Sequence, residues 1–393
     1  MSPDTLQLSW RARLCRWAAA SVAAWAAVVA GCGGGVGVGG TGAYASGPVT
    51  GFGSIFVNGI EFEDRNAQVE DESGASRSRD ALRLGMLVEV ESGPIGGTSS
   101  APTATATRIR FASELVGPVQ SVDLAGSSLT VLGQTVLVAS GRTAFDASYT
   151  EGLASVALGG NVEVYGFYGL NGRLIATRIE PRGGTLAAFK LRGAVSGLDL
   201  GARTFRLGAL TLDYDGVVPP TGLRDGLIVR VTIATTAVGG RWKVLTFEDG
   251  VRRLPDRGDA RLRGTITAFA TTRSFSINGQ PVDASTATLE NESGIALGAR
   301  VEAEGAASGG VLRATRVKVD DGGAEVGELR GTIEASFPAL QTFVLRGVRV
   351  TYGVNTEFQD GSAADLSVGR EVEARGVLSA DGTRLLATRI RIR

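Results

Sequence analysis

The 393-residue sequence contains no histidine, and its two cysteines, Cys15 and Cys32, both lie near the N-terminus. The absence of histidine excludes a Ser-His-Asp triad, a histidine general base and the histidine motifs of zinc proteases. The body of the chain lacks cysteine, so we expect no disulfide framework, zinc site or cysteine nucleophile there. We therefore predict that the protein is not an enzyme and uses no cofactor.

Lysine and tryptophan are also scarce. The only lysines, none in a Ser-x-x-Lys pattern, are Lys190, Lys243 and Lys318. Trp242 is the one tryptophan outside the N-terminal segment. Residues 33–393 carry 37 basic and 39 acidic residues, a net charge of −2. Single-stranded nucleic acid needs a basic groove and stacking aromatics, so we expect no nucleic-acid partner.

The N-terminal segment has the organisation of a bacterial export signal. Arg11, Arg13 and Arg16 precede an apolar run from Trp17 to Ala30, which is short for a bilayer span but fits a secretory signal. The run ends in Val29-Ala30-Gly31-Cys32, which resembles the lipobox of bacterial lipoproteins. The resemblance implies diacylation of Cys32 and anchoring to the membrane through the acyl chains. The alternative is an ordinary signal peptide that is cleaved near Ala45.

Two neighbouring features bear on location. Gly33, rather than Asp, follows the cysteine, and by resemblance to the known sorting pattern this favours the outer membrane. Residues 33–42 are nearly all glycine, but a phosphate-binding loop needs a strand before it and a helix after it. We interpret this stretch as a flexible tether. We expect an outer-membrane-anchored lipoprotein of the cell envelope that faces the periplasm or the cell surface.

A glycine followed by a short alternating strand recurs at intervals of 67 to 76 residues. The recurring glycines are Gly47, Gly117, Gly193, Gly264 and Gly331. Each is followed by a hairpin pattern, and Asn58-Gly59 and Asn278-Gly279 are strong signals for a type I′ turn. Alternation predicts that Phe275 and Ile277 are buried, as are Phe343 and Leu345. No stretch after residue 45 has a long helical period, although 149–158 and 362–368 could each form one helical turn.

Two further phrases close each repeat. The fourth strand carries Gly-x-x-Val-Glu-Val/Ala, and the fifth carries Ala-Thr-Arg-Ile/Val, as in Ala387-Thr-Arg-Ile390. If these strands are neighbours, the Glu and the Arg should meet outside the core. The expected pairs are Glu89 with Arg108, Glu163 with Arg178, Glu302 with Arg316, and Glu373 with Arg389. In the divergent third repeat, Arg230 and Glu248 should form the pair with the signs exchanged.

Five short strands in about 70 residues would leave two exposed edges unless the sheet closes. We therefore predict an all-β fold, a tandem array of five small five-stranded antiparallel OB-like barrels behind an N-terminal signal segment. An open antiparallel sheet with repeats paired edge to edge is the alternative. The expected boundaries are 1–32 for the signal peptide, 33–45 for the tether, and 46–113, 114–185, 188–252, 258–321 and 325–393 for the barrels. We expect each barrel to be stable largely on its own.

Residues 46–393 resemble bacterial lipoproteins built from tandem copies of the domain-of-unknown-function 5666 family. The two closing phrases and the opening Gly47-Pro-Val-Thr-Gly-Phe-Gly-Ser-Ile55 carry the resemblance. It implies architecture and location, and it implies no activity.

The acidic residues of the first repeat are the main candidates for chemistry. They are Glu61, Glu63, Asp64, Glu70, Asp71 and Glu72. Carboxylates can bind Ca²⁺ or act as acid and base, but we interpret this set as a solvated hairpin and loop, and no EF-hand spacing is present. Tyr165, Phe167 and Tyr168 could offer a sugar platform or could pack in a core or between repeats.

These observations favour a non-enzymatic envelope protein whose barrels act as a spacer or as a binding array for an envelope protein or polysaccharide. The alternatives are a module that binds a saccharide or a divalent cation, and a carboxylate-dependent hydrolase.

Overall fold

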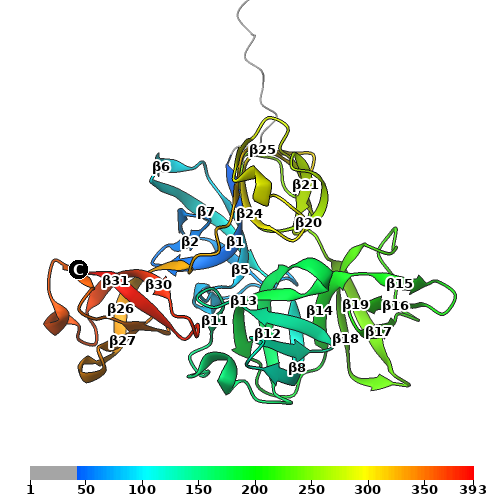
Figure 1. Cartoon of the computed structure of the whole chain (residues 1–393), viewed down its shortest axis with the longest axis horizontal. Helices are drawn as coiled ribbons and strands as arrows, with labels where there is room; N and C mark the ends of the chain where they lie inside the picture. Colours follow the sequence, from blue (N-terminus) through cyan, green and yellow to red (C-terminus); the bar gives the residue numbers. More distant parts are fainter. Residues whose placement is uncertain (1–41) are drawn as a thin grey trace, which may run out of the picture. The chain divides into compact units, whose positions relative to one another are not determined.

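The structure, a computed structural model, describes residues 42–393, and this part of the chain is all-β (Figure 1). Its helical elements are short 3₁₀ turns: η1 (Arg79–Ala81), η2 (Gly152–Ser155), η3 (Leu170–Gly172), η4 (Glu292–Gly294), η5 (Pro338–Leu340) and η6 (Ala363–Asp365). The turns expected within 149–158 and 362–368 are η2 and η6. No helix among the described residues has the length and apolar character needed to cross a bilayer. Cys32 and most of the expected tether lie outside these residues.

Residues 115–181 form a small closed barrel of five strands. The strands are β8 (Leu115–Asp123), β9 (Ser128–Val131), β10 (Gln134–Val138), β12 (Asn161–Tyr168) and β13 (Leu174–Pro181). Each pairs with two others in the order β8–β9–β10–β13–β12, and β12 pairs with β8 to close the ring. The short β11 (Ala144–Phe145) also pairs in parallel with β13, beyond the part of β13 that pairs with β10. Closure leaves no unpaired edge, which was the physical reason to expect a barrel.

The same pairing order recurs in the last two segments. Residues 257–319 contain β20 (Arg257–Thr271), β21 (Ser274–Ile277), β22 (Gln280–Asp283), β23 (Thr288–Glu290), β24 (Arg300–Ser308) and β25 (Val311–Val319). Residues 326–392 contain β26 (Val326–Phe337), β27 (Thr342–Leu345), β28 (Val348–Thr351), β29 (Glu357–Gln359), β30 (Glu371–Leu378) and β31 (Arg384–Ile392). In both segments the first strand pairs with the second and with the next-to-last, as β8 does with β9 and β12.

The remaining strands follow this order with local differences. Residues 43–111 contain β1 (Ala43–Phe52), β2 (Ile55–Val57), β3 (Ile60–Glu63), β4 (Gln68–Glu70), β5 (Leu87–Ser92), β6 (Gly96–Thr98) and β7 (Ala101–Phe111). Residues 189–249 contain β14 (Phe189–Ala194), β15 (Ser196–Asp199), β16 (Thr204–Leu207), β17 (Leu210–Asp213), β18 (Ile228–Val238) and β19 (Arg241–Asp249). β1 begins at Ala43, inside the stretch 33–45 that the sequence assigned to the tether.

The expectation of purely antiparallel barrels is wrong, because each barrel has a parallel pairing between its third strand and its last strand. β10 and β13 run parallel, as do β22 and β25, and β28 and β31. The cause is geometric: neighbours that alternate in direction cannot close a ring with an odd number of strands, so a five-stranded ring needs at least one parallel pair.

The recurring first-strand glycine makes room for the hairpin that follows it. Asn278 and Gly279 both have positive φ, and this favours the type I′ turn between β21 and β22. The side-chain amide of Asn278 lies against the first strand, β20. Its Oδ1 accepts a hydrogen bond from the Thr265 N–H at 3.0 Å. A Cβ on Gly264 would lie 2.0 Å from Nδ2 of Asn278. Gly47 and Asn58 repeat this arrangement in β1, with a separation of 2.1 Å to Oδ1.

Gly264→Ala should therefore lower the free energy of unfolding by about 1–3 kcal/mol, the usual range for overpacking. Chemical denaturation of the variant and the parent protein measures the difference. Gly183→Ala is the matched control, since a Cβ there meets no atom within 4 Å. The double variant Gly264→Ala/Asn278→Gly should recover part of the loss, because the clashing amide is gone. A single variant as stable as the parent would contradict this role for the glycine.

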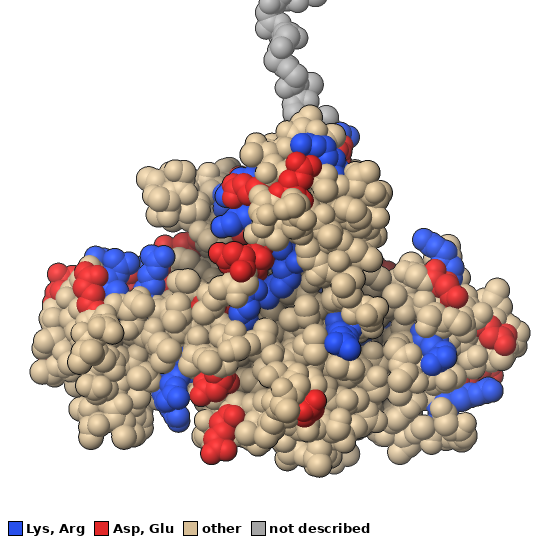
Figure 2. Space-filling model, in the orientation of Figure 1, with Lys and Arg blue, Asp and Glu red and all other residues tan. Residues whose placement is uncertain are grey.

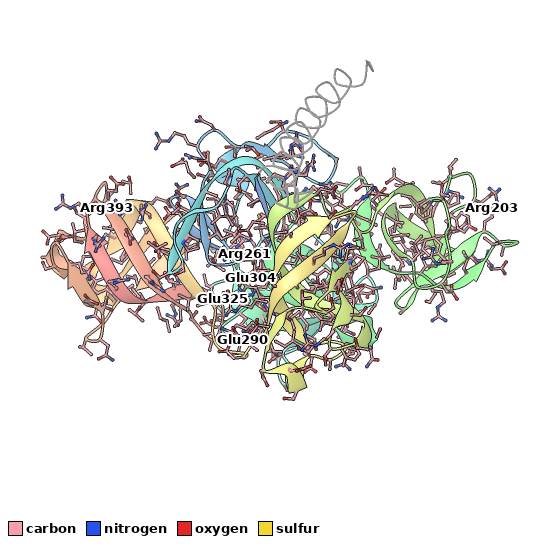
Figure 3. All side chains as sticks on the ribbon, turned by 90° about the horizontal axis from the view of Figure 1, so that it is seen from above. Arg203, Arg261, Glu290, Glu304, Glu325 and Arg393 are labelled. Carbon is pink, nitrogen blue, oxygen red and sulfur yellow. The ribbon has the colours of Figure 1, made fainter. Side chains whose placement is uncertain are left out.

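Charges of both signs are interspersed on the surface (Figure 2). Many of them form ion pairs between neighbouring strands, such as Arg261 Nε with Glu304 Oε2 at 3.4 Å (Figure 3). Arg393 Nη2 likewise lies 2.6 Å from Glu373 Oε2. These side chains are only partly exposed; ion pairs at the protein surface contribute about 0–1 kcal/mol each.

The side chains predicted to fill the barrel cores are buried. Phe275, Ile277, Phe343 and Leu345 are each at most 5% exposed. Their neighbours Ser274 and Ser276 are more exposed, which confirms the expected alternation.

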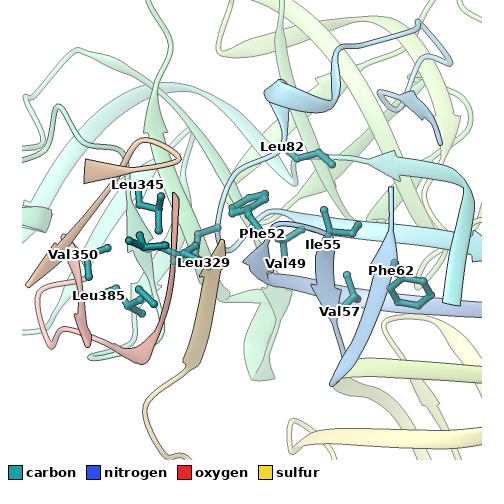
Figure 4. Close-up of a cluster of buried hydrophobic side chains, with 14 of the residues drawn as sticks. Val49, Phe52, Ile55, Val57, Phe62, Leu82, Leu329, Leu345, Val350 and Leu385 are labelled. Atoms are coloured by element: carbon teal, nitrogen blue, oxygen red, sulfur yellow. The ribbon is translucent and has the colours of Figure 1, made fainter. Parts of the chain in front are cut away.

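The cores are not isolated from one another, as independent barrels would require. One continuous apolar cluster joins residues of 45–109 to residues of 329–392 (Figure 4). Phe52 on β1 lies opposite Leu329 on β26, where these strands pair in parallel. β1 also pairs in parallel with β20 along Ala43–Ser46. Backbone hydrogen bonds and a common core link these segments. We therefore expect their stabilities to be coupled, in contrast to the prediction that each barrel is stable largely on its own.

Candidate functional site

The acidic residues of the first segment are paired with basic side chains. Within residues 42–393, no group of three or more carboxylates is arranged to hold a metal ion. Each of the six carboxylates instead lies within 4.0 Å of a basic side chain, as Glu70 does with Arg110 at 2.9 Å. The Glu72 carboxylate accepts a hydrogen bond from Lys190. The sequence showed the density of these carboxylates, but their partners lie up to 269 residues away.

The aromatic cluster is buried and offers no open platform. Tyr165 is 1% exposed and Phe167 is 2% exposed. Burial raises the pKa of the Tyr165 hydroxyl well above its usual value. The Tyr168 hydroxyl donates a hydrogen bond to the Arg192 carbonyl, and the Arg300 guanidinium lies 5.3 Å from the centre of the Phe167 ring. This cluster therefore packs within and between segments.

The fourth and fifth strands are neighbours, as predicted, but the charged pairs differ from those expected. In the observed register, Arg108 faces Glu91 rather than Glu89, and Arg316 faces Glu304 rather than Glu302. Arg178 faces Tyr165, and Arg389 faces Arg375. A β-bulge interrupts each of these ladders, for example between Glu304 and Gly305. The sequence phrases do not reveal the offset between the strands.

The third segment places the two predicted residues opposite each other but does not join them in an ion pair. Arg230 and Glu248 lie directly opposite each other on β18 and β19, so they share a face. No ion pair joins them in the described chain. Arg230 Nη2 instead lies 3.7 Å from Oε1 of Glu114, which precedes β8.

These displaced charges surround a cavity of about 530 Å³, which we call the junction cavity. Its lining comes from 44–114, Gly166 and Phe167, 192–252, and Asn278 and Gln280. The arginines in the lining are Arg110, Arg192, Arg230 and Arg252. The carboxylates are Glu72, Glu89, Glu114, Glu248 and Asp249. Sequence reasoning missed this site because segments far apart in the chain build it.

Arg192 is held firmly at one wall of the junction cavity. Its Nη1 lies 2.9 Å from Glu114 Oε2, its Nη2 donates to the Asn278 carbonyl at 3.2 Å, and its Nε donates to the Gly250 carbonyl. Arg192 and Glu114 are both buried. A charge pair with several hydrogen bonds can persist in such a place, since its donors are largely satisfied.

Other lining groups have unused hydrogen-bonding capacity. Arg230 is only 8% exposed, and its Nε has no partner among the described residues. Glu89 Oε2 lies 3.9 Å from Arg252 Nη1, beyond hydrogen-bond distance. Burial raises the pKa of Glu89, against the opposing charges of Arg252 and Arg110. The junction cavity thus presents both donors and acceptors to whatever enters it.

Comparisons with known proteins identify a repeated domain. The family model described as "Domain of unknown function (DUF5666)" matches residues 116–180, 263–318 and 330–391. Residues 46–113 and 188–252, which the sequence resemblance included, are outside these matches. No curated protein matches the chain. Among solved structures, the chain is similar to one described as "drosophila Unr CSD456", with 13% identity, coverage of 53% of this chain and 98% of that chain, and a TM-score of 0.14.

Proposed function

We propose that the protein is a non-enzymatic, lipid-anchored component of the cell envelope, in which five OB-like barrels form a tandem spacer or binding array. The observation that carries this proposal is the strand order that recurs along the chain behind the lipobox at Cys32. In this proposal, residues 43–111 and 189–249 are divergent barrels of the array. The acyl chains hold the protein in the outer membrane, and the described residues provide the surface that meets an envelope protein or polysaccharide.

The charge pattern supports this assignment over the catalytic alternative. A carboxylate-dependent hydrolase needs a carboxylate free to accept or give a proton, whereas each acidic side chain of the first segment lies near an Arg or Lys. The balanced surface also fits a neutral partner better than nucleic acid. Crosslinking in intact envelopes, followed by purification, should recover a distinct envelope protein or glycan. Recovery of the protein alone would remove the binding part of the proposal.

Cys32→Ser should release the protein from the membrane into the soluble extracytoplasmic fraction, because the acyl chains would have no attachment point. Each buried methylene contributes about 0.8 kcal/mol to anchoring. Fractionation of cells that produce each form, followed by immunoblotting, measures the shift. Cys15→Ser is the matched control and should leave the protein in the membrane fraction. Retention of the Cys32 variant in the membrane would contradict the lipid anchor.

A further inference from the structure

We propose that the junction cavity is the ligand site of this array, and that it binds a short neutral saccharide. This inference rests on the proposed binding function and gives it a location and a ligand class. The cavity volume of about 530 Å³ lies within the usual range for small-molecule sites, about 300–1,000 Å³.

The strongest pointer to a ligand is the guanidinium of Arg230. The side chain is buried, yet its closest carboxylate atom, Glu114 Oε1, is 3.7 Å from Nη2. The Nε proton has no acceptor in the described chain. The same holds for the Nε of six other described arginines, so this atom alone does not point to a ligand. Arg230 differs in that it lines the cavity and that its Nη2 lies beyond hydrogen-bond distance of Glu114. A hydroxyl oxygen entering the cavity could accept a hydrogen bond from this terminal nitrogen.

The same cavity offers acceptors that need donors. Glu248 is half-buried, and no hydrogen bond or ion pair reaches its carboxylate from residues 42–393. Glu89 makes only the 3.9 Å contact with Arg252. A sugar hydroxyl both donates and accepts hydrogen bonds. A polyhydroxylated ring can therefore accept a hydrogen bond from Arg230 and donate hydrogen bonds to the two glutamates.

The charge balance and the apolar lining favour a neutral saccharide over an ion. The positive charges of four arginines act on the Glu89 carboxylate. A cation entering the cavity would be repelled by these same charges. An anion would meet Glu89, Glu248 and Asp249. Among the lining aromatics, Tyr44 and Phe167 are buried, whereas Phe111 is half-buried. Phe111 therefore contributes the aromatic surface that suits the C–H face of a pyranose ring.

The test uses the full-length protein purified in detergent and an array of neutral and acidic glycans. We expect retention of neutral di- or trisaccharides, and calorimetry with the best of them measures the affinity. Arg230→Gln should weaken that affinity by about tenfold or more, since a hydrogen bond from a charged donor is lost. Glu248→Ala should also weaken it, and its half-buried, unpartnered carboxylate makes this variant the less disruptive one. Arg241→Gln, at an exposed position on β19, is the matched control.

Thermal unfolding of each variant separates lost binding from lost folding. Affinity for a neutral glycan that falls in both cavity variants, while Arg241→Gln binds as the parent does, would support the site. Three results would overturn it: no glycan retained, acidic glycans alone retained, or unchanged affinity in both folded cavity variants. Membrane release of Cys32→Ser and recovery of a crosslinked partner are measured separately from glycan binding. The cavity proposal can therefore be rejected while the proposed anchored array is supported.

Discussion

Asp320→Asn should lower the free energy of unfolding by about 3–5 kcal/mol, the usual effect of removing one partner from a buried ion network. The Asp320 carboxylate accepts a hydrogen bond from Arg142, and lies 3.3 Å from Arg263 Nη2 and 3.5 Å from Arg300 Nε. All four side chains are at most 15% exposed. An amide in its place would leave three guanidinium groups without their common negative charge.

The effect should also depend on pH. Burial opposes ionisation of Asp320, but the hydrogen bond from Arg142 and the charge of Arg300 outweigh it, and the pKa lies well below its usual value. A depressed carboxyl pKa stabilises the folded state above the unfolded-state pKa of about 3.9, and this contribution is lost as the pH falls below that value. The stability difference between parent and variant should therefore be largest near neutral pH and shrink towards pH 2.

Urea unfolding at several pH values measures this difference. Asp360→Asn is the matched control, because Asp360 meets Arg391 at 3.5 Å but its side chain is 71% exposed. An exposed pair contributes about 0–1 kcal/mol. A loss below about 1 kcal/mol in the Asp320 variant at pH 7 would show that the three arginines find other partners.

Phe343→Ala should cost about 3–5 kcal/mol, because it removes a fully buried aromatic ring and leaves a cavity. Phe343 belongs to the apolar cluster that joins residues 45–109 to 329–392. We therefore expect amide hydrogen exchange to accelerate in β1 and β2 as well as in β26 and β27. Hydrogen exchange measured by mass spectrometry on the folded variant gives the exchange rate of each strand separately.

Phe205→Ala provides the comparison, since Phe205 is equally buried in a separate cluster that contains residues of 115–244. It should accelerate exchange in that part of the chain and leave β26–β31 protected. Faster exchange confined to 326–392 in the Phe343 variant would restore the view that each barrel is stable on its own.

Local patterns allowed much of each barrel to be predicted. Asn278-Gly279 indicates its turn because the two backbone conformations suit those residues, and Phe275 and Ile277 are buried because alternate strand residues share a face. The alignment of Arg316 with Glu304 depends on the offset between the two strands, which the closing phrases do not specify. The adjacent bulge falls at Gly305, and Gly166 and Gly376 hold the same place in two other repeats, so a glycine within the fourth strand was a signal that our prediction did not use.

The junction cavity could not be found in the sequence for a different reason. Arg230, Glu89 and Glu114 belong to separate repeats, and the sequence pattern assigned Arg230 to a pair with Glu248 within the third repeat. Repetition reveals what the barrels have in common, whereas the cavity depends on residues in which they differ. The ion network of Asp320 also joins separate segments, since Arg142 and Asp320 are 178 residues apart.

The position of β1 has a mechanical consequence for a protein held at its N-terminal end. Along Ala43–Ser46, β1 is bonded on one side to β5 and on the other to β20. A pull along the strand would load both rows of hydrogen bonds in shear, so they would have to break together rather than one after another. If the proposed lipid anchor holds the N-terminal end, tension from the membrane would thus load the pairing with β5 and the pairing with β20 at the same time.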